Sequence, residues 1–128
     1  MRLTKTLAAA LTLSILFLPG AGKIARAADG AQIFRQDCAI CHDTEPGKNK
    51  LGPSLAGIVG RKSGSIADYT YSSAMRSAGL TWDEKTLDKY LTNPHAVVPG
   101  TKMLFIGVKN GKDRQALIQY LATLKSGS

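Results

Sequence analysis

The 128-residue chain has few of the sulfur and imidazole side chains that bind metals, with two cysteines and two histidines in all. Without a second pair of cysteines, a structural zinc site lacks its usual four donors. The sequence also lacks an internal repeat, a second domain and strong strand-forming runs. We therefore expect a single small all-α domain whose chemistry depends on very few residues.

No uncharged hydrophobic run approaches the roughly 20 residues that a membrane-spanning helix needs. The longest candidate is the 12-residue segment 7–18. Arg2 and Lys5 precede it and small residues up to Ala27 follow it, which is the order of a secretory signal peptide. We expect a signal peptide over residues 1–27, cleaved after Ala27, and export to the periplasm; retention as a membrane anchor is the alternative.

Cleavage would leave a mature chain of 101 residues, 28–128, and would lower the formal charge from +8 to +4, because the signal holds four basic residues and no acidic ones. So mild a charge argues against a nucleic-acid-binding protein. About 100 residues bury only a modest core, so a large apolar cofactor would stabilise the fold considerably.

Cys38, Cys41 and His42 fall within five residues, CAICH, and four chemistries use such a group. A disulfide across two residues closes too small a loop to stabilise much. A thioredoxin-like redox pair follows a strand and precedes a helix, whereas helical signals precede these cysteines and loop residues follow them. A zinc site would have to borrow the isolated His95 as its fourth ligand.

The fourth chemistry is covalent haem, for which Cys-x-x-Cys-His is the attachment signature. Cysteines three residues apart lie on one helical face, so both sulfurs of Cys38 and Cys41 can reach the vinyl groups of one porphyrin. His42 then meets the iron, and the Pro53 carbonyl is expected to accept its second N–H. We favour haem c over the three other chemistries.

The occupant of the second axial position decides between carrier, sensor and enzyme. Met75 falls in a predicted short helix and suits packing, and His95 follows Asn93–Pro94 on an expected exposed turn. Met103 lies in a loop after Pro99–Gly100, with apolar residues behind it that can hold its sulfur. We expect Met103 to ligate the iron. A six-coordinate iron has no open position for oxygen or peroxide, which leaves one-electron transfer as its role.

Helical signals alternate with loops along the mature chain. A first helix begins at the capping box 29–32 and delivers the cysteines, and a long loop covers residues 42–68. A short helix is capped by Ser72 and ended by a left-handed Gly79. A third runs from the capping box 81–84 to Asn93–Pro94, and a last helix is capped within residues 110–113.

Several motifs carry a resemblance across nearly all of residues 28–128: CAICH, GPSLAGIVGRKSG, YTYSSA, GLTW, YLTNPHAVVPGTKM and ALIQYL. With them the chain resembles the class I c-type cytochromes, and among these the mitochondrial-like soluble cytochromes c of bacterial periplasms. The resemblance implies the small cytochrome c fold, in which helices and long loops wrap around one covalent haem.

The resemblance also implies roles for individual residues. Cys38 and Cys41 would form the thioether bonds, and His42 and Met103 would be the axial ligands. Three residues resemble those that bond the haem propionates in a buried pocket: Arg61, Tyr71 and Trp82. The polar pair beside the methionine sulfur would be Tyr90 and Thr101, and the contact between first and last helices would join Gly30 and Phe34 to Leu117 and Tyr120.

The implied function is a soluble, monomeric electron carrier and not an enzyme. It would shuttle electrons between a quinol–cytochrome c reductase and a terminal oxidase, with a photosynthetic reaction centre or a dehydrogenase as other possible partners. Eight of the 13 basic residues of the mature chain lie between Glu45 and Asp68 or from Lys89 to Lys112, with no acid among them. We expect a moderately basic face at the haem edge and only transient contact with membrane complexes.

Two features depart from the family pattern in the expected docking region. Asp37 stands immediately before Cys38, where many relatives have lysine, and His95–Ala96 replaces a lysine pair. Met75 occupies a place that is often asparagine. The runner-up function is a haem peroxidase or gas sensor with a labile sixth ligand, and a thioredoxin-like exchanger is the third.

Overall fold

The computed structural model describes residue 26 and residues 29–127. The predicted cleavage site after Ala27, and all of the predicted signal peptide except residue 26, lie outside the described residues. No described helix is long and apolar enough to cross a membrane.

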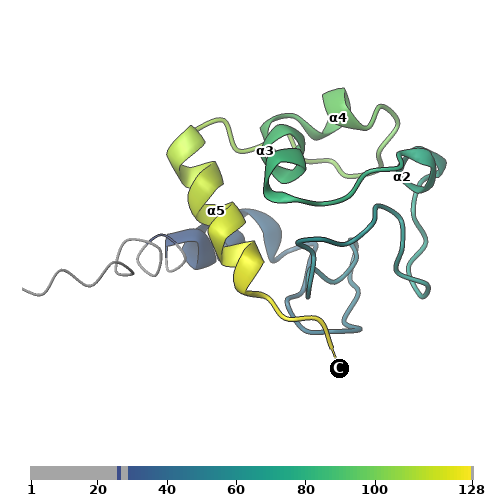
Figure 1. The fold of residues 1–128 in the computed structure, drawn as a ribbon, viewed down its shortest axis with the longest axis horizontal. Helices are drawn as coiled ribbons and strands as arrows, with labels where there is room; N and C mark the ends of the chain where they lie inside the picture. The colour runs from purple at the N-terminus through teal and green to yellow at the C-terminus, as the bar shows by residue number, and fades with distance from the viewer. Residues whose placement is uncertain (1–25, 27–28, 128) are drawn as a thin grey trace, which may run out of the picture.

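The regular structure of the described residues is helical (Figure 1), as predicted. Residues 29–33 form an α-helix that continues into a π-helical turn. The helical elements from that turn onward are η1 (Phe34–Cys38), α2 (Ser73–Ser77), α3 (Glu84–Thr92), α4 (Pro94–Val97) and α5 (Gly111–Thr123). The one β-bridge among these residues joins Lys62 and Thr81.

The first helix widens where it reaches the cysteines. The Ala39 N–H donates to the Phe34 carbonyl at 2.9 Å, five residues back, which is the π-helical pattern. Phe34 and Cys38 are both buried on its inner side. The predicted start at Asp29 is wrong, because Asp29 and residue 26 are already helical.

The helix ends follow local capping chemistry. The Ser72 hydroxyl accepts from the Met75 N–H at 3.1 Å, and Gly79 has a φ of 64°, so both predicted ends of α2 are confirmed. The predicted capping box of α3 starts two residues too early, since the cap is Asp83, whose carboxylate accepts from the Thr86 N–H at 2.7 Å. Asn110 caps α5 as predicted, accepting from two N–H groups.

The first helix and α5 cross at close range (Figure 1). A Cβ on Gly30 would lie 2.7 Å from the Tyr120 Cβ and closer still to the Ala116 carbonyl. Beyond this crossing, the rings of Phe34 and Tyr120 pack with their centroids 5.6 Å apart, and Leu117 is fully buried. The predicted contact between the first and last helices is confirmed.

A second junction ties α5 to α3. The Arg114 Nε donates to the Asp88 carboxylate at 2.7 Å, and the Gln115 side chain donates to the same oxygen at 3.0 Å. Arg114 also donates to the Val108 carbonyl at 3.0 Å. The two helices therefore hold the segment between α4 and α5 in place.

A long non-helical segment separates η1 from α2, as predicted. It is held by backbone hydrogen bonds: the Gly52 N–H donates to the Cys41 carbonyl at 2.8 Å, and the Leu55 N–H donates to the Asp43 carbonyl at 2.9 Å. The Gly57 N–H donates to the Leu124 carbonyl at 3.1 Å, which ties the loop to the end of α5. The loop is thus anchored to the residues that follow η1 and to the C-terminal end of α5.

Replacing Gly30 by alanine should force the first helix and α5 apart. We expect Gly30→Ala to lower the free energy of unfolding by about 1–3 kcal/mol, the usual cost of overpacking, as measured by urea denaturation of the haem-loaded protein. Gly111→Ala is the matched control, because the nearest atom to its new Cβ would be 3.8 Å away. An equal loss of stability in both variants would contradict the close crossing.

Candidate cofactor site

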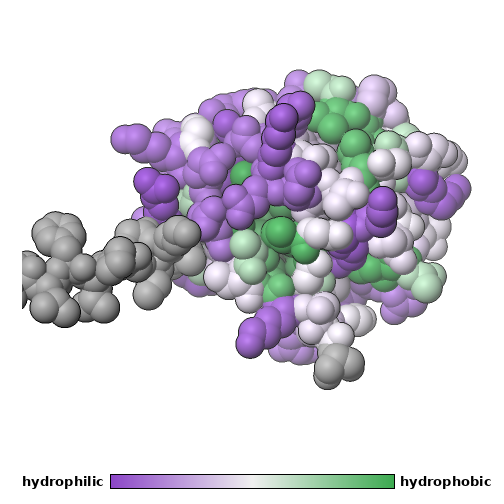
Figure 2. Space-filling view, viewed as in Figure 1, coloured by the Kyte–Doolittle hydropathy of each residue, from purple (hydrophilic) through white to green (hydrophobic). Residues whose placement is uncertain are grey.

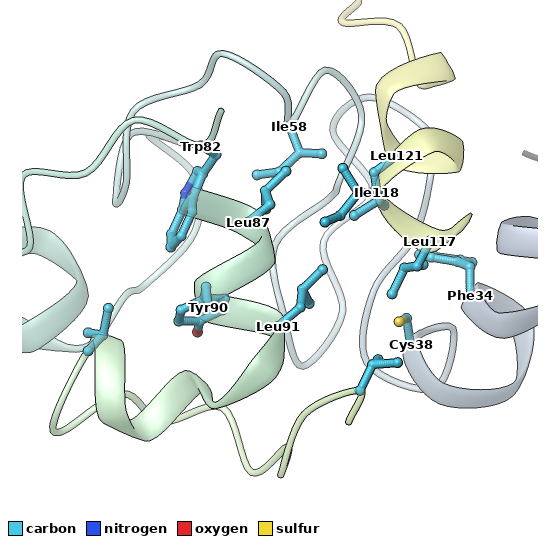
Figure 3. Packing of buried hydrophobic residues seen from close by; sticks show 12 residues of the cluster. Phe34, Cys38, Ile58, Trp82, Leu87, Tyr90, Leu91, Leu117, Ile118 and Leu121 are labelled. Atoms are coloured by element: carbon cyan, nitrogen blue, oxygen red, sulfur yellow. The ribbon is translucent and has the colours of Figure 1, made fainter. Parts of the chain in front are cut away.

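A cavity of about 550 Å³ lies within the hydrophobic core. Its volume is in the range of small-molecule and cofactor sites. Buried side chains of η1, α3 and α5 form much of its wall, and Figure 3 shows several of them, among them Leu87, Leu91 and Leu117. All nine residues predicted for the site line this one cavity: Cys38, Cys41, His42, Arg61, Tyr71, Trp82, Tyr90, Thr101 and Met103.

Cys38 and Cys41 are not joined to each other by a disulfide. Burial, the Asp37 charge and Cys41 together raise the pKa of the Cys38 thiol to about 12. Redox-active Cys-x-x-Cys pairs need the opposite, a thiol whose pKa is lowered so that the thiolate forms near neutral pH. The site therefore disfavours thiol–disulfide exchange. Within residues 26 and 29–127, no three His, Cys, Asp or Glu side chains gather in a group that could hold a metal ion.

His42 is buried and held from two sides. Its Nδ1 donates to the Pro53 carbonyl at 2.8 Å, which is the predicted hydrogen bond. Burial lowers the pKa of His42, and the charges of Arg61 and Lys50 lower it further, against the opposing effect of the bond to Pro53. The imidazole is therefore neutral at physiological pH. With Nδ1 occupied, Nε2 is the nitrogen left with a lone pair to bind a metal.

Met103 enters the cavity from the extended segment that follows α4. The Tyr90 hydroxyl donates to the Met103 Sδ at 3.4 Å and lies 3.4 Å from the Thr101 Oγ1. Tyr90 and Thr101 are buried, and burial raises the pKa of Tyr90. This small polar group orients the thioether inside an otherwise apolar wall.

The remaining predicted residues, Arg61, Tyr71 and Trp82, also line the cavity. Arg61 donates to the Ala56 carbonyl at 3.1 Å and to the Ser54 carbonyl at 2.9 Å, which leaves further donors of its guanidinium group free. Burial lowers the pKa of Arg61, although a guanidinium remains charged at physiological pH. The Trp82 and Tyr90 rings pack together (Figure 3), with their centroids 4.8 Å apart.

The model of the cytochrome c family matches residues 27–125. The chain belongs to the cytochrome c family. It is 56% identical to cytochrome c2 of Rhodomicrobium vannielii over 95 residues, covering 73% of this chain and 75% of that protein. It is 54% identical to cytochrome c2 iso-2 of Magnetospirillum molischianum over 88 residues, covering 69% and 91%.

A solved structure, cytochrome cH from Methylobacterium extorquens, superposes with a TM-score of 0.71 at 44% identity, over 76% of this chain and 97% of that one. The predicted class I cytochrome c family and its all-α fold are thereby confirmed. As a cytochrome c, the protein is a c2-like electron carrier with one covalent haem c, attached through the two cysteines Cys38 and Cys41.

The residues present fit this cofactor. The cavity is large and mostly apolar, and both cysteine sulfurs line it. A neutral imidazole and a thioether in the same cavity could ligate the iron. Arg61 places a positive charge at one corner, where the anionic propionate groups of a haem need compensation.

Sequence reasoning missed Gly52, which controls the position of the His42 ring. A Cβ on Gly52 would lie 2.7 Å from His42 Nδ1, 2.8 Å from Nε2, and closer still to Cε1. It also missed Tyr69, whose hydroxyl donates to the Leu51 carbonyl at 2.6 Å and whose ring lies under the Lys102 ammonium group. The sequence signal that could have indicated Gly52 is its place directly before Pro53. No local pattern marks Tyr69.

His95 and Met75, which were considered for the second axial position of the iron and not chosen, lie in different places. His95 is exposed on α4 and does not line the cavity. The predicted exposure is correct, but the residue belongs to a one-turn helix, begun by Pro94 and capped by Asn93. Met75, on α2, does line the cavity and packs against the core.

Replacing Gly52 by alanine should displace the His42 ring and weaken its hydrogen bond to Pro53. We expect a changed haem absorption spectrum and a shifted Nδ1–H resonance in proton NMR of the haem-loaded protein. Gly60→Ala is the control, because its Cβ would meet nothing within 4 Å and only its backbone, at φ 89°, would be strained. If both variants keep the wild-type resonance, Gly52 does not position the ring.

Proposed function

We propose that the protein is a periplasmic one-electron carrier whose haem c iron is ligated by His42 and Met103. The haem supplies one redox centre, which takes up and releases a single electron. The observation that carries this assignment is the arrangement of the two candidate iron ligands: a buried neutral imidazole and a half-buried thioether line the same cavity as the two cysteines.

The protein side chains keep both proposed ligands in place. Pro53 and Gly52 restrain the His42 ring, and the Tyr90 hydroxyl bonds to the Met103 sulfur. Held in this way, the two side chains would move little during the one-electron chemistry that the haem would supply, which would favour fast electron exchange. Since His42 and Met103 would both hold the iron, a substrate would have no site on it, and we propose that the protein is a carrier and not an enzyme.

Other residues of the cavity would bind and neutralise the haem edge. We propose that Arg61, Tyr71 and Trp82 hold the propionates, since all three line the cavity and Arg61 has unused donors. The Tyr71 hydroxyl accepts from the Ile66 N–H at 3.3 Å, which leaves its own proton free to donate. Tyr90 and Thr101 tune the thioether ligand.

For partners we propose a quinol–cytochrome c reductase as donor and a terminal oxidase, reaction centre or similar complex as acceptor. Several lysines of the two basic windows are exposed, among them Lys50, Lys62, Lys102 and Lys109. Their charge would speed the encounter with an acidic partner, and a shuttle that must also leave quickly binds it weakly, as a monomer.

We further propose that residues 1–27 are a signal peptide and that the cytochrome c domain spans residues 28–128. The order of basic residues, uncharged segment and small residues supports export. Covalent haem and a basic mature chain fit a carrier that works in the periplasm.

Met103→Ala tests the ligand assignment. We expect the sulfur-to-iron absorption band of the oxidised protein to vanish and the reduction potential to fall by on the order of 100 mV or more, because a thioether favours ferrous iron. The reduced variant should also bind carbon monoxide rapidly. Absorption spectroscopy and redox titration measure all three effects.

Met75→Ala is the matched control, since Met75 is the other methionine lining the cavity. It should keep the band and a potential close to that of the wild type. Loss of the band in Met75→Ala and its retention in Met103→Ala would mean that Met75 is the ligand. Rapid carbon monoxide binding by the wild-type protein would instead favour a peroxidase or gas sensor.

Mass spectrometry of the protein released from the periplasm tests export. We expect a covalent haem and an N-terminus at Ala28. Ala25→Lys should block cleavage, because signal peptidase sites need small residues there, whereas Arg26→Lys should be cleaved normally. A wild-type protein that keeps residues 1–27 and sediments with membranes would be an anchored carrier instead.

A further inference from the structure

After α5 the chain turns back over the segment 46–57. Leu124 leaves the helix with an extended backbone, at ψ 118°, and its carbonyl accepts from the Gly57 N–H at 3.1 Å. Its half-buried side chain packs against the hydrophobic core. We call residues 124–127 the C-terminal strap. Figure 1 shows it in yellow below α5, and the same view in Figure 2 shows mainly hydrophilic and neutral residues at this lower edge.

The strap lies so close to this segment that only glycine fits beneath it at one point. A Cβ on Gly57 would lie 2.7 Å from the Ser126 Cβ and 2.9 Å from the Ser126 Cα. At the other end of the segment, a Cβ on Gly127 would lie 2.9 Å from the Pro46 Cβ. The strap therefore lies against both ends of residues 46–57.

Ser54 connects the same two ends from the inside. Its buried hydroxyl donates to the Glu45 carbonyl at 2.6 Å and accepts from the Ala56 N–H at 3.2 Å. Glu45 and Ala56 are the direct neighbours of Pro46 and Gly57, which the strap covers. The strap outside and the Ser54 hydroxyl inside therefore hold one loop between them.

This loop carries the hydrogen-bond acceptor of the His42 ring. The Pro53 carbonyl, directly before Ser54, accepts from His42 Nδ1 at 2.8 Å. A displacement of either end of the loop is therefore passed through Ser54 to that carbonyl. A hydrogen bond of this kind keeps a ligating imidazole in one orientation and raises its basicity toward a metal.

We propose that the C-terminal strap is a positioning element for the haem, which holds the Pro53 carbonyl against His42 and so keeps the imidazole oriented and basic. This role rests on the proposed ligation of the haem iron by His42. A more basic imidazole stabilises ferric iron, so the strap keeps the reduction potential lower than it would be without it. Residues 124–127 thus help to set the potential although none of them lines the cavity.

Two variants displace the strap by different routes. Gly57→Ala pushes Ser126 away, and a chain that ends at Leu124 lacks the rest of the strap. In proton NMR of the reduced, haem-loaded protein, we expect hydrogen exchange of the His42 Nδ1–H to become about tenfold faster in both, the scale of losing one net hydrogen bond. Redox titration should show a raised reduction potential in both variants, because the imidazole becomes less basic.

Gly47→Ala is the matched control. Gly47 lies in the same loop with a similar backbone, at φ 74° against 64° for Gly57, but its Cβ would meet nothing within 4 Å. It should keep the wild-type potential and Nδ1–H exchange. The Val108 N–H, which donates to the Leu91 carbonyl at 2.7 Å, is the internal reference, and its exchange should change by less than about twofold in every variant.

Three results would overturn the positioning role alone: wild-type Nδ1–H exchange or potential in both strap variants, equal changes in Gly47→Ala, or an equal acceleration at the Val108 N–H, which would mean a general loss of stability. A wild-type protein whose His42 resonances lack the large shift that a haem ring imposes on its axial ligand would overturn ligation by His42, and the role of the strap with it.

Discussion

The cofactor cavity and the hydrophobic core of this protein are built from the same side chains. Leu87 and Leu91 of α3, Leu117 and Leu121 of α5 and Cys38 of η1 are all buried, and all line the cavity. A domain of about 100 residues buries only a modest hydrophobic core, so a cofactor that shares this core contributes much of its apolar contact. The haem therefore belongs to the core, and apolar side chains of η1, α3 and α5 would hold it. Binding of the cofactor is therefore expected to stabilise the fold as well.

Polar groups enter this apolar wall only where they can be satisfied. His42 has the Pro53 carbonyl, Tyr90 has Met103 and Thr101, and Arg61 has two backbone carbonyls. Among the described residues, no buried side-chain nitrogen or oxygen lacks a hydrogen-bond partner. A satisfied polar group stays in one orientation, because leaving its partner costs desolvation without compensation. That rigidity suits a site where a metal must change charge without moving its ligands.

Much of the architecture could be predicted because it depends on local chemistry. Ser72 and Asn110 cap helices with their own side chains, and Gly79 adopts the left-handed backbone that ends α2. The errors have local causes too. Asp83, and not Thr81, caps α3, and Asp29 already lies within the first helix. Gly52 and Tyr69 escaped prediction because their partners, the His42 ring and the Lys102 ammonium group, come from other segments.

The sequence alone determined the chemistry, because the cysteine spacing in CAICH, the adjacent histidine and the order of helices and loops are properties of neighbouring residues. Tertiary structure alone decided which distant groups meet. Lys102 reaches Thr70, and Ile40 and Leu51 come to line one cavity with Leu104. Such contacts depend on how closely helices cross, as Gly30 allows against Ala116, and a linear pattern carries no distance between segments far apart in the chain.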